Sequence, residues 1–232
     1  MDVGKLYEQL RQTAVRQGAK AFGVADLDML RRTTPDLLCG IPGSYARAVV
    51  FGMRLQRAVL EGIRNEPTPL YVHNYRQLNY QLDRAAWCMA DQIQDAGGAA
   101  VAVAASQIVQ SVPMTGHVSH KRLGWAAGLG HIGRSTLLIH PAFGAQLRYA
   151  SVLTDLLLPP GRPVERDCGT CRRCRDVCPA GAIGETSRDF NLAACYRMLN
   201  TEFVHVSFVG QHVCGVCLKA CPGSGVAEFS GE

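Results

Sequence analysis

The sequence contains ten cysteines, and eight of them lie between residues 168 and 221. They form two runs that end alike: Cys168-x2-Cys171-x2-Cys174-x3-Cys178-Pro179 and Cys195-x18-Cys214-x2-Cys217-x3-Cys221-Pro222. Two-residue gaps wrap the backbone around one centre and point neighbouring sulfurs toward it. Proline suits the helix start that follows each run, because no backbone N–H is needed there. The spacing therefore predicts metal-bound thiolates.

The first run has the spacing that holds pairs of [4Fe–4S] clusters in bacterial ferredoxins, where the fourth cysteine of a run ligates the other cluster. This crossover predicts a first cluster on Cys168, Cys171, Cys174 and Cys221. It predicts a second cluster on Cys178, Cys195, Cys214 and Cys217. The long gap before Cys214 departs from the compact pattern, so Cys195 must return from a loop insertion. Two neighbouring clusters would serve low-potential electron transfer, or a reduction supplied by it.

Three other interpretations explain the cysteines less well. Structural zinc uses four ligands in two CxxC pairs, which leaves the two x3-Cys-Pro endings unexplained. Disulfides do not fit a reducing compartment. A degenerate motif would lack some of the cysteines, whereas all eight are present. The other two, Cys39 and Cys88, are predicted to be buried side chains that behave as small apolar groups.

Composition places the chain among soluble globular proteins. Its 232 residues are 47% hydrophobic and 19% charged, which is enough apolar material for a sizeable core. Neither a signal peptide nor an apolar run long enough to cross a bilayer is seen, so a cytoplasmic protein without a membrane partner is expected. Two oxidised clusters of charge about −2 each would bring the formal charge of +5 to about +1. The basic pI therefore does not indicate a nucleic-acid surface.

The scaffold for these cysteines is predicted from hydrophobic periodicity. Helices are expected over 6–14 and 78–93, and strands over 19–27, 48–55, 99–105, 136–139 and 147–153, the last two joined through 141–144. This mixture lacks the regular alternation of a doubly wound sheet. A stiff connector, Leu158-Pro159-Pro160-Gly161, marks the predicted domain boundary. We expect one α/β domain over residues 1–160 and a cysteine-rich domain over residues 161–232.

The segment AAGLGHIGRSTLLIHPAFGAQLRYASVLTD (126–155), taken with the cysteine runs, resembles the epoxyqueuosine reductase family and the related cobalamin-dependent reductive dehalogenases. That family carries A-G-L-G-x-I-G-[KR]-[NS], a strand pair, a T-D ending and then a cluster domain. The resemblance reaches back through 19–27 and 48–55 and covers most of the chain. It implies an α+β protein: a nitroreductase-like, cobalamin-chaperone-like α/β domain followed by a ferredoxin-like domain with two [4Fe–4S] clusters.

The resemblance further implies that the motif contacts cobalamin. The residues assigned to cofactor binding in this way are Gly128, Leu129, Gly130, His131, Ile132, Gly133, Arg134 and Ser135. Closely spaced glycines leave backbone without side chains, which lets a flat ligand approach. They equally permit tight helix and turn packing, and the residues alone leave both explanations open. No dinucleotide or P-loop fingerprint stands in the proper frame.

This sequence departs from the family at three points. The acidic proton donor ten positions before Gly130 is replaced by His120, which can deliver a proton near neutral pH. An aromatic residue is usual where His131 stands, so the pocket is expected to be reshaped. Eleven residues follow Cys221, without the helical repeat extension that holds tRNA. No nucleic-acid partner is therefore expected.

The favoured hypothesis is an oxygen-sensitive iron–sulfur reductase. An external donor of the ferredoxin or flavodoxin type would reduce the clusters, and a cobalamin would pass the electrons to an unidentified small molecule. The alternative is a ferredoxin-type electron-transfer protein without a substrate of its own. An additional domain of about 160 residues is large for an electron carrier, which favours the reductase.

Overall fold

The computed structural model describes residues 2–34, 41–42, 44–107, 109–111, 114–206 and 212–224. Cys39 lies outside these residues. The chain forms two compact units, of which the first contains Met1–Met53, Leu78–Gly130 and Arg148–Val164. The second contains Arg54–Gln77, His131–Leu147 and Glu165–Glu232. The cysteine-rich segment therefore shares its unit with two earlier segments, 54–77 and 131–147.

A four-stranded sheet forms the centre of the first unit. Its strand order is β1-β2-β8-β3, with bounds Ala19–Asp26, Arg47–Arg54, Leu147–Thr154 and Ala100–Val103 respectively. β1 pairs with β2 and β3 pairs with β8, both antiparallel. The predicted mixture of helices and sheet is confirmed, as are four of the predicted strands to within a few residues.

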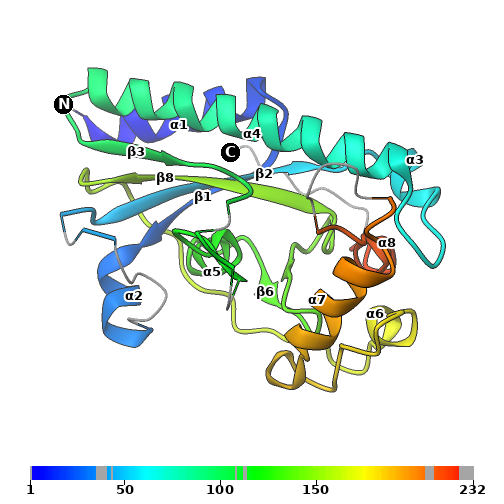
Figure 1. Cartoon of the computed structure of the whole chain (residues 1–232). Helices are drawn as coiled ribbons and strands as arrows, with labels where there is room; N and C mark the ends of the chain where they lie inside the picture. The colour runs from blue at the N-terminus through cyan, green and yellow to red at the C-terminus, as the bar shows by residue number, and fades with distance from the viewer. Residues whose placement is uncertain are drawn as a thin grey trace. The chain divides into compact units, whose positions relative to one another are not determined.

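Two long helices cover one face of this sheet (Figure 1). α1 (Val3–Arg16) begins after Asp2, whose carboxylate accepts the N–H groups of Gly4 and Lys5. α4 (Pro69–Asp95) begins nine residues before the predicted start and buries the expected apolar stripe. The prediction for Cys88 is wrong: its side chain is exposed beside Trp87, because both lie on the helix face opposite that stripe.

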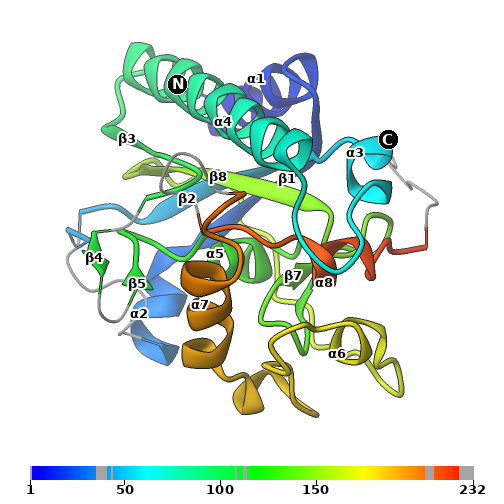
Figure 2. The same cartoon turned by 45° about the vertical axis from the view of Figure 1, so that its right-hand side comes forward.

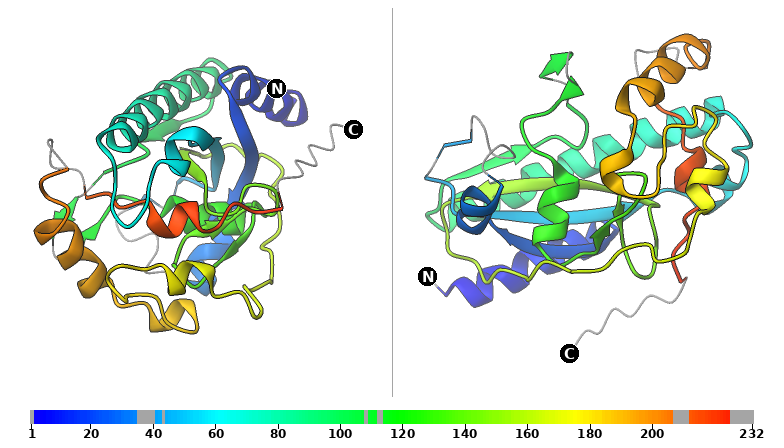
Figure 3. Two further views of the ribbon diagram at one scale, coloured as in Figure 1. Left: turned by 90° about the vertical axis from the view of Figure 1, so that its right-hand side faces the viewer. Right: turned by 90° about the horizontal axis from the view of Figure 1, so that it is seen from below.

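α5 (His120–Ala126) packs near β1 on the sheet face opposite α1 and α4 (Figure 3). The remaining elements are short: α2 (Leu27–Thr33), α3 (Arg57–Glu61), α6 (Arg173–Asp176), a 3-10 helix (Ser187–Asp189), α7 (Leu192–Thr201) and α8 (Val216–Lys219). β4 (Gln110–Ser111) and β5 (Met114–Thr115) form a separate pair (Figure 2). None of the helices in the described ranges is both long and apolar enough to span a bilayer.

The second unit contains another short hairpin, in which β6 (His131–Ile132) pairs with β7 (Leu138–Ile139). Leu137 O accepts the N–H of Gly133, and Gly133 O accepts that of Thr136, whose φ is +58°. The strand predicted over 136–139 therefore does not pair with the strand over 147–153. Local hydrogen bonding to β6 takes its place, and this keeps residues 131–139 beside the cysteine-rich segment.

Candidate metal centre

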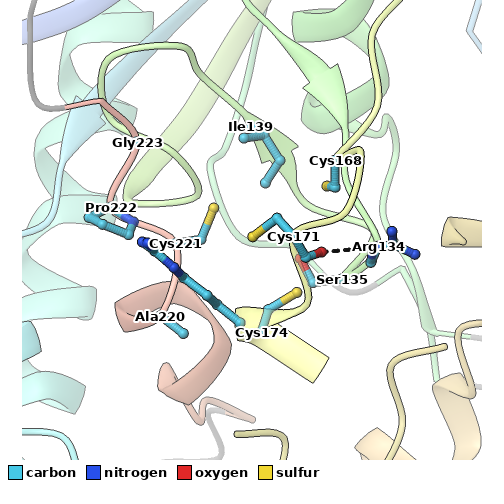
Figure 4. A pocket seen from close by; sticks show the side chains of 11 residues that line it. Arg134, Ser135, Ile139, Cys168, Cys171, Cys174, Ala220, Cys221, Pro222 and Gly223 are labelled. Carbon is cyan, nitrogen blue, oxygen red and sulfur yellow. Dashed lines mark hydrogen bonds between the residues drawn. The ribbon is translucent and has the colours of Figure 1, made fainter. Parts of the chain in front are cut away.

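Four cysteines of the second unit line one cavity of about 190 Å³. They are Cys168, Cys171, Cys174 and Cys221, and Figure 4 shows their side chains arranged around a common space. The other lining residues are Arg134, Ser135, Ile139, Arg173, Ala220, Pro222 and Gly223. A water occupies about 30 Å³ of liquid, so the cavity has room for a group of several atoms. These cysteines are the four that the spacing assigned to one cluster.

The first run folds into a tight turn that presents its sulfurs. Cys168 O accepts the N–H of Cys171 at 3.0 Å, and Asp167 Oδ1 accepts that of Gly169 at 2.7 Å. Gly169 has a φ of +52°, a left-handed conformation that favours glycine. α6 then carries Cys174. Cys171 is exposed, so this side of the cavity faces solvent.

Arg134 holds this turn from the β6–β7 hairpin. Its guanidinium donates to the carbonyl oxygens of Cys171, at 3.0 Å, and Gly169, and its side chain is only 12% exposed (Figure 4). It also pairs with Glu185 at 3.3 Å. The hydrogen bond from Arg134 lowers the pKa of Glu185, and Arg172 and Arg175 beside the same carboxylate lower it further. Arg134 therefore fixes the cysteine turn and adds positive charge to the cavity wall.

The loop after β7 holds the other end of the same cysteine set. Cys221 O accepts the N–H of Ala145 at 3.0 Å, and Pro141 O accepts that of Ser224 at 3.0 Å. Gly144 has a φ of +57°, and a Cβ at this position would overlap the carbonyl of Cys221. The segment 131–147 thus contacts both the first run and Cys221. The turn over 141–144 is recognisable from the sequence, whereas the contact of Gly144 with Cys221 is not.

The other four cysteines, Cys178, Cys195, Cys214 and Cys217, also lie near one another. Burial raises the pKa of Cys214 to about 11, and the nearby thiols of Cys195 and Cys178 raise it as well. Burial likewise raises the pKa of Cys217, and the thiols of Cys214, Cys195 and Cys178 add to the effect. Cys174 acts on Cys217 too, so the two cysteine sets adjoin each other within the second unit.

Electrostatic contacts group Cys221 with the first run. Burial raises the pKa of the Cys221 thiol, and Cys174, Cys168 and Cys171 raise it further. Cys221 therefore lies beside the three cysteines of the first run, with which it lines the cavity. Among the described residues, no three His, Cys, Asp or Glu side chains lie close enough to hold a single metal ion. The four thiols that line the cavity of about 190 Å³ are therefore more widely spaced than the ligands of a tetrahedral zinc site, whose four sulfurs surround one ion.

The predicted cobalamin-contacting residues divide between the two units. Gly128, Leu129 and Gly130 lie in the first unit, where a Cβ on Gly128 would be 2.8 Å from Arg162 O. Close packing therefore explains Gly128 without a ligand. The other five residues of the motif lie in the second unit, where Ser135 is buried and lines the cysteine cavity. Contact of this motif with a corrinoid stays a prediction.

His131 lies directly beside the first cysteine run. Its Nε2 is 3.8 Å from the Sγ of Cys168. Burial lowers the pKa of His131, and the nearby carboxylate of Asp167 opposes this effect. A Cβ on Gly133, two residues along, would stand 3.2 Å from the same sulfur. A larger side chain at position 133 would therefore keep the hairpin farther from Cys168.

His120 sits at the start of α5 with both ring nitrogens engaged. Its Nε2 is 2.9 Å from Ala104 O, and its Nδ1 is 2.8 Å from the buried Ser151 Oγ. A carbonyl only accepts, so Nε2 carries the proton and the serine hydroxyl donates to Nδ1. Burial lowers the pKa of His120 to about 4. A pKa this low favours the neutral ring at pH 7, and its two hydrogen bonds hold it against Ala104 and Ser151 in the first unit.

The chain is similar to two groups of known proteins. No family model matches the chain. It is 25% identical to epoxyqueuosine reductase of Bacillus anthracis, over 96% of this chain and 60% of that protein. A reductive dehalogenase solved in connection with B12-dependent dehalogenation has a TM-score of 0.75 at 20% identity, covering 95% of this chain and 32% of that one. The structure of epoxyqueuosine reductase with an epoxyqueuosine-modified tRNA-Tyr stem loop has a TM-score of 0.62 at 18% identity. The match covers 95% of this chain and 66% of that one.

The fold is therefore the mixed helix-and-sheet fold that reductive dehalogenases and epoxyqueuosine reductases share. In sequence as well as in fold, the chain is similar to epoxyqueuosine reductases, which confirms the predicted resemblance. It spans 60% of the length of the Bacillus relatives that it matches. Cofactors, substrate and partners are accordingly matters of proposal.

Proposed function

We propose that this chain is an iron–sulfur reductase that holds two [4Fe–4S] clusters on its eight C-terminal cysteines. The observation that supports this most is the cavity of about 190 Å³ lined by Cys168, Cys171, Cys174 and Cys221. The thiols reach it from sequence positions up to 53 apart, in the set that a ferredoxin-type crossover requires.

The cavity wall supplies what such a cluster needs. Burial raises the pKa of the Cys174 and Cys221 thiols, and the positive charge of a bound metal would favour their thiolate forms. Arg134 and Arg173 line the same space and offset the negative charge of a cluster with four thiolates. When bound, the clusters supply one-electron transfer at low potential.

Two further components complete the proposed reaction. A ferredoxin- or flavodoxin-type donor would deliver electrons, and the exposed Cys171 supports entry at the first cluster. A corrinoid would supply the cobalt chemistry that reduces a small-molecule substrate. The support for the corrinoid is the relationship to epoxyqueuosine reductases and to a dehalogenase described as B12-dependent. The proposed contacts are Gly128 to Ser135.

His120 is the proposed proton source at the position that the resemblance marks. Its proton sits on Nε2 in the bond to Ala104 O, so delivery requires that this bond open. A purely structural role competes with this proposal, because the lowered pKa keeps the ring neutral near pH 7. Replacing His120 by Gln separates the two roles. If His120 is the proton source, the substitution changes the pH profile of turnover. If its role is structural, the substitution changes the stability of the protein alone.

The alternative function is electron transfer without a substrate. Titrating the anaerobically reconstituted protein with cob(II)alamin, followed by EPR, distinguishes the two. The reductase predicts stoichiometric uptake with a base-off cobalt signal. Lack of uptake at micromolar corrinoid would leave the electron carrier. Adding tRNA in a parallel binding assay tests the further prediction that no nucleic acid is bound.

A further inference from the structure

We propose that His131 raises the reduction potential of the first cluster relative to the second by donating a ring N–H hydrogen bond to the Sγ of Cys168. The proposal rests on the proposed function, because it needs a cluster on Cys168. It assigns to His131 a task that the corrinoid-contact interpretation of the motif does not include.

The β6–β7 hairpin fixes the ring at the distance that such a bond requires. His131 pairs with Ile139 across the hairpin, and its Nε2 lies 3.8 Å from the Cys168 sulfur. Gly133 makes this approach possible, because a Cβ there would lie 2.6 Å from the Ile139 side chain and 3.2 Å from the same sulfur. The contact is therefore built into a hydrogen-bonded hairpin and does not depend on a mobile surface side chain.

The direction of the effect follows from charge. Reduction adds an electron to the cluster and its thiolates, and a hydrogen bond to a sulfur stabilises the more negative state more strongly. Removing the donor should therefore favour the oxidised first cluster. In the second set, Cys178 Sγ accepts a backbone N–H, that of Ala182, at 3.4 Å. That bond survives any change of side chain at position 131, so the second cluster is an internal reference.

The expected change is modest but measurable. A hydrogen bond that strengthens on reduction shifts the ratio of reduced to oxidised cluster at fixed potential by roughly threefold to tenfold. A tenfold change corresponds to about 59 mV for a one-electron couple. Potentiometric titrations followed by EPR resolve shifts of this size.

Two substitutions test the proposal in the reconstituted protein. His131→Phe keeps a ring and removes the donor, whereas His131→Gln keeps an N–H group. Variants Cys168→Ala and Cys214→Ala, each lacking one cluster, assign the two EPR signals. We expect the reduced fraction of the first cluster to fall in His131→Phe and to be partly restored in His131→Gln, with the second cluster unchanged. The proposal would be overturned if the potential of the first cluster were unchanged in His131→Phe, or if it shifted equally in His131→Phe and His131→Gln. It would also be overturned if the potentials of both clusters shifted equally.

A second measurement needs no substitution at His131, in case His131→Phe loads iron poorly. Pulsed EPR of the reduced wild-type protein labelled with ¹⁵N-histidine should show a weak ¹⁵N coupling to the first cluster, identified in Cys214→Ala protein. Absence of this coupling rejects the hydrogen bond. Failure of the proposed function looks different: the protein would then lack about eight irons per chain and give no reduced-cluster signal at all.

Discussion

Replacing Gly144 by alanine should weaken the first cysteine set, whereas the same change at Gly181 should not. Both glycines have a φ of +57°, so an alanine costs about 1–2 kcal/mol of backbone strain at either position. The surroundings differ. A Cβ at Gly144 would overlap the Cys221 carbonyl and lie 2.5 Å from the N of Gly223, whereas nothing lies within 4 Å of one at Gly181. The pair therefore isolates the contact from the strain.

The extra cost at Gly144 follows from the overlap with backbone atoms, which cannot rotate away. Overpacking of this kind costs about 1–3 kcal/mol, equivalent to roughly fivefold to hundredfold weaker retention of a cluster that needs Cys221. We would reconstitute both variants anaerobically and follow iron loss to a chelator. The Gly144→Ala protein should lose about half of its iron quickly, and clearly faster than Gly181→Ala, which carries the strain without the overlap. Equal rates for the two variants would refute the role assigned to the segment 131–147.

Three further predictions concern the two units. Burial lowers the pKa of His120 from 6.5 to about 4, so between these two pH values the unfolded chain binds a proton that the folded chain does not bind. The free energy of unfolding should therefore fall by about 2 kcal/mol from pH 7 to pH 5, and His120→Gln should remove this dependence. Arg134→Gln should speed iron loss from the first site about tenfold, because two loop carbonyls lose a charged donor. The double variant Cys168→Ala/Cys221→Ala should lose no more iron than either single variant. The double variant Cys168→Ala/Cys178→Ala should lose all of its iron.

Each of these predictions has a control. The exposed His117, changed to Gln, should keep the wild-type pH dependence of unfolding, measured by urea titration under anaerobic conditions. Persistence of the full slope in His120→Gln would show that its burial is not the cause. Arg188 is exposed in the same unit, and Arg188→Gln should leave iron loss unchanged. Additive loss of iron on combining the Cys168 and Cys221 substitutions would contradict the crossover.

The four cysteines that line the cavity could be grouped from sequence, because their spacing is itself a geometric constraint. Gaps of two residues force neighbouring sulfurs to one centre, and the x3-Cys-Pro ending carries the fourth thiol away. The core was equally predictable: the stripe of α4 and the buried strands follow from hydrophobic periodicity. Cys88 shows the limit of residue type as a guide, since a cysteine on the outer face of an amphipathic helix is exposed whatever its usual preference.

Long-range contacts were not predictable in the same way. Nothing in the local pattern indicates that β7 pairs with β6, or that Gly144 meets the backbone of Cys221, 77 residues later. The motif around Arg134 stood out by its glycines, and a ligand was the natural explanation. In the structure, Arg134 holds the Cys168–Cys171 turn, a task that a sequence motif cannot distinguish from cofactor contact.

Metal and sulfide analysis of anaerobically purified protein shows whether the eight thiols hold two [4Fe–4S] clusters. Two clusters require about eight irons and eight acid-labile sulfides per chain, with little zinc. Four irons or fewer after full reconstitution, or zinc bound without sulfide, would rule out the two clusters.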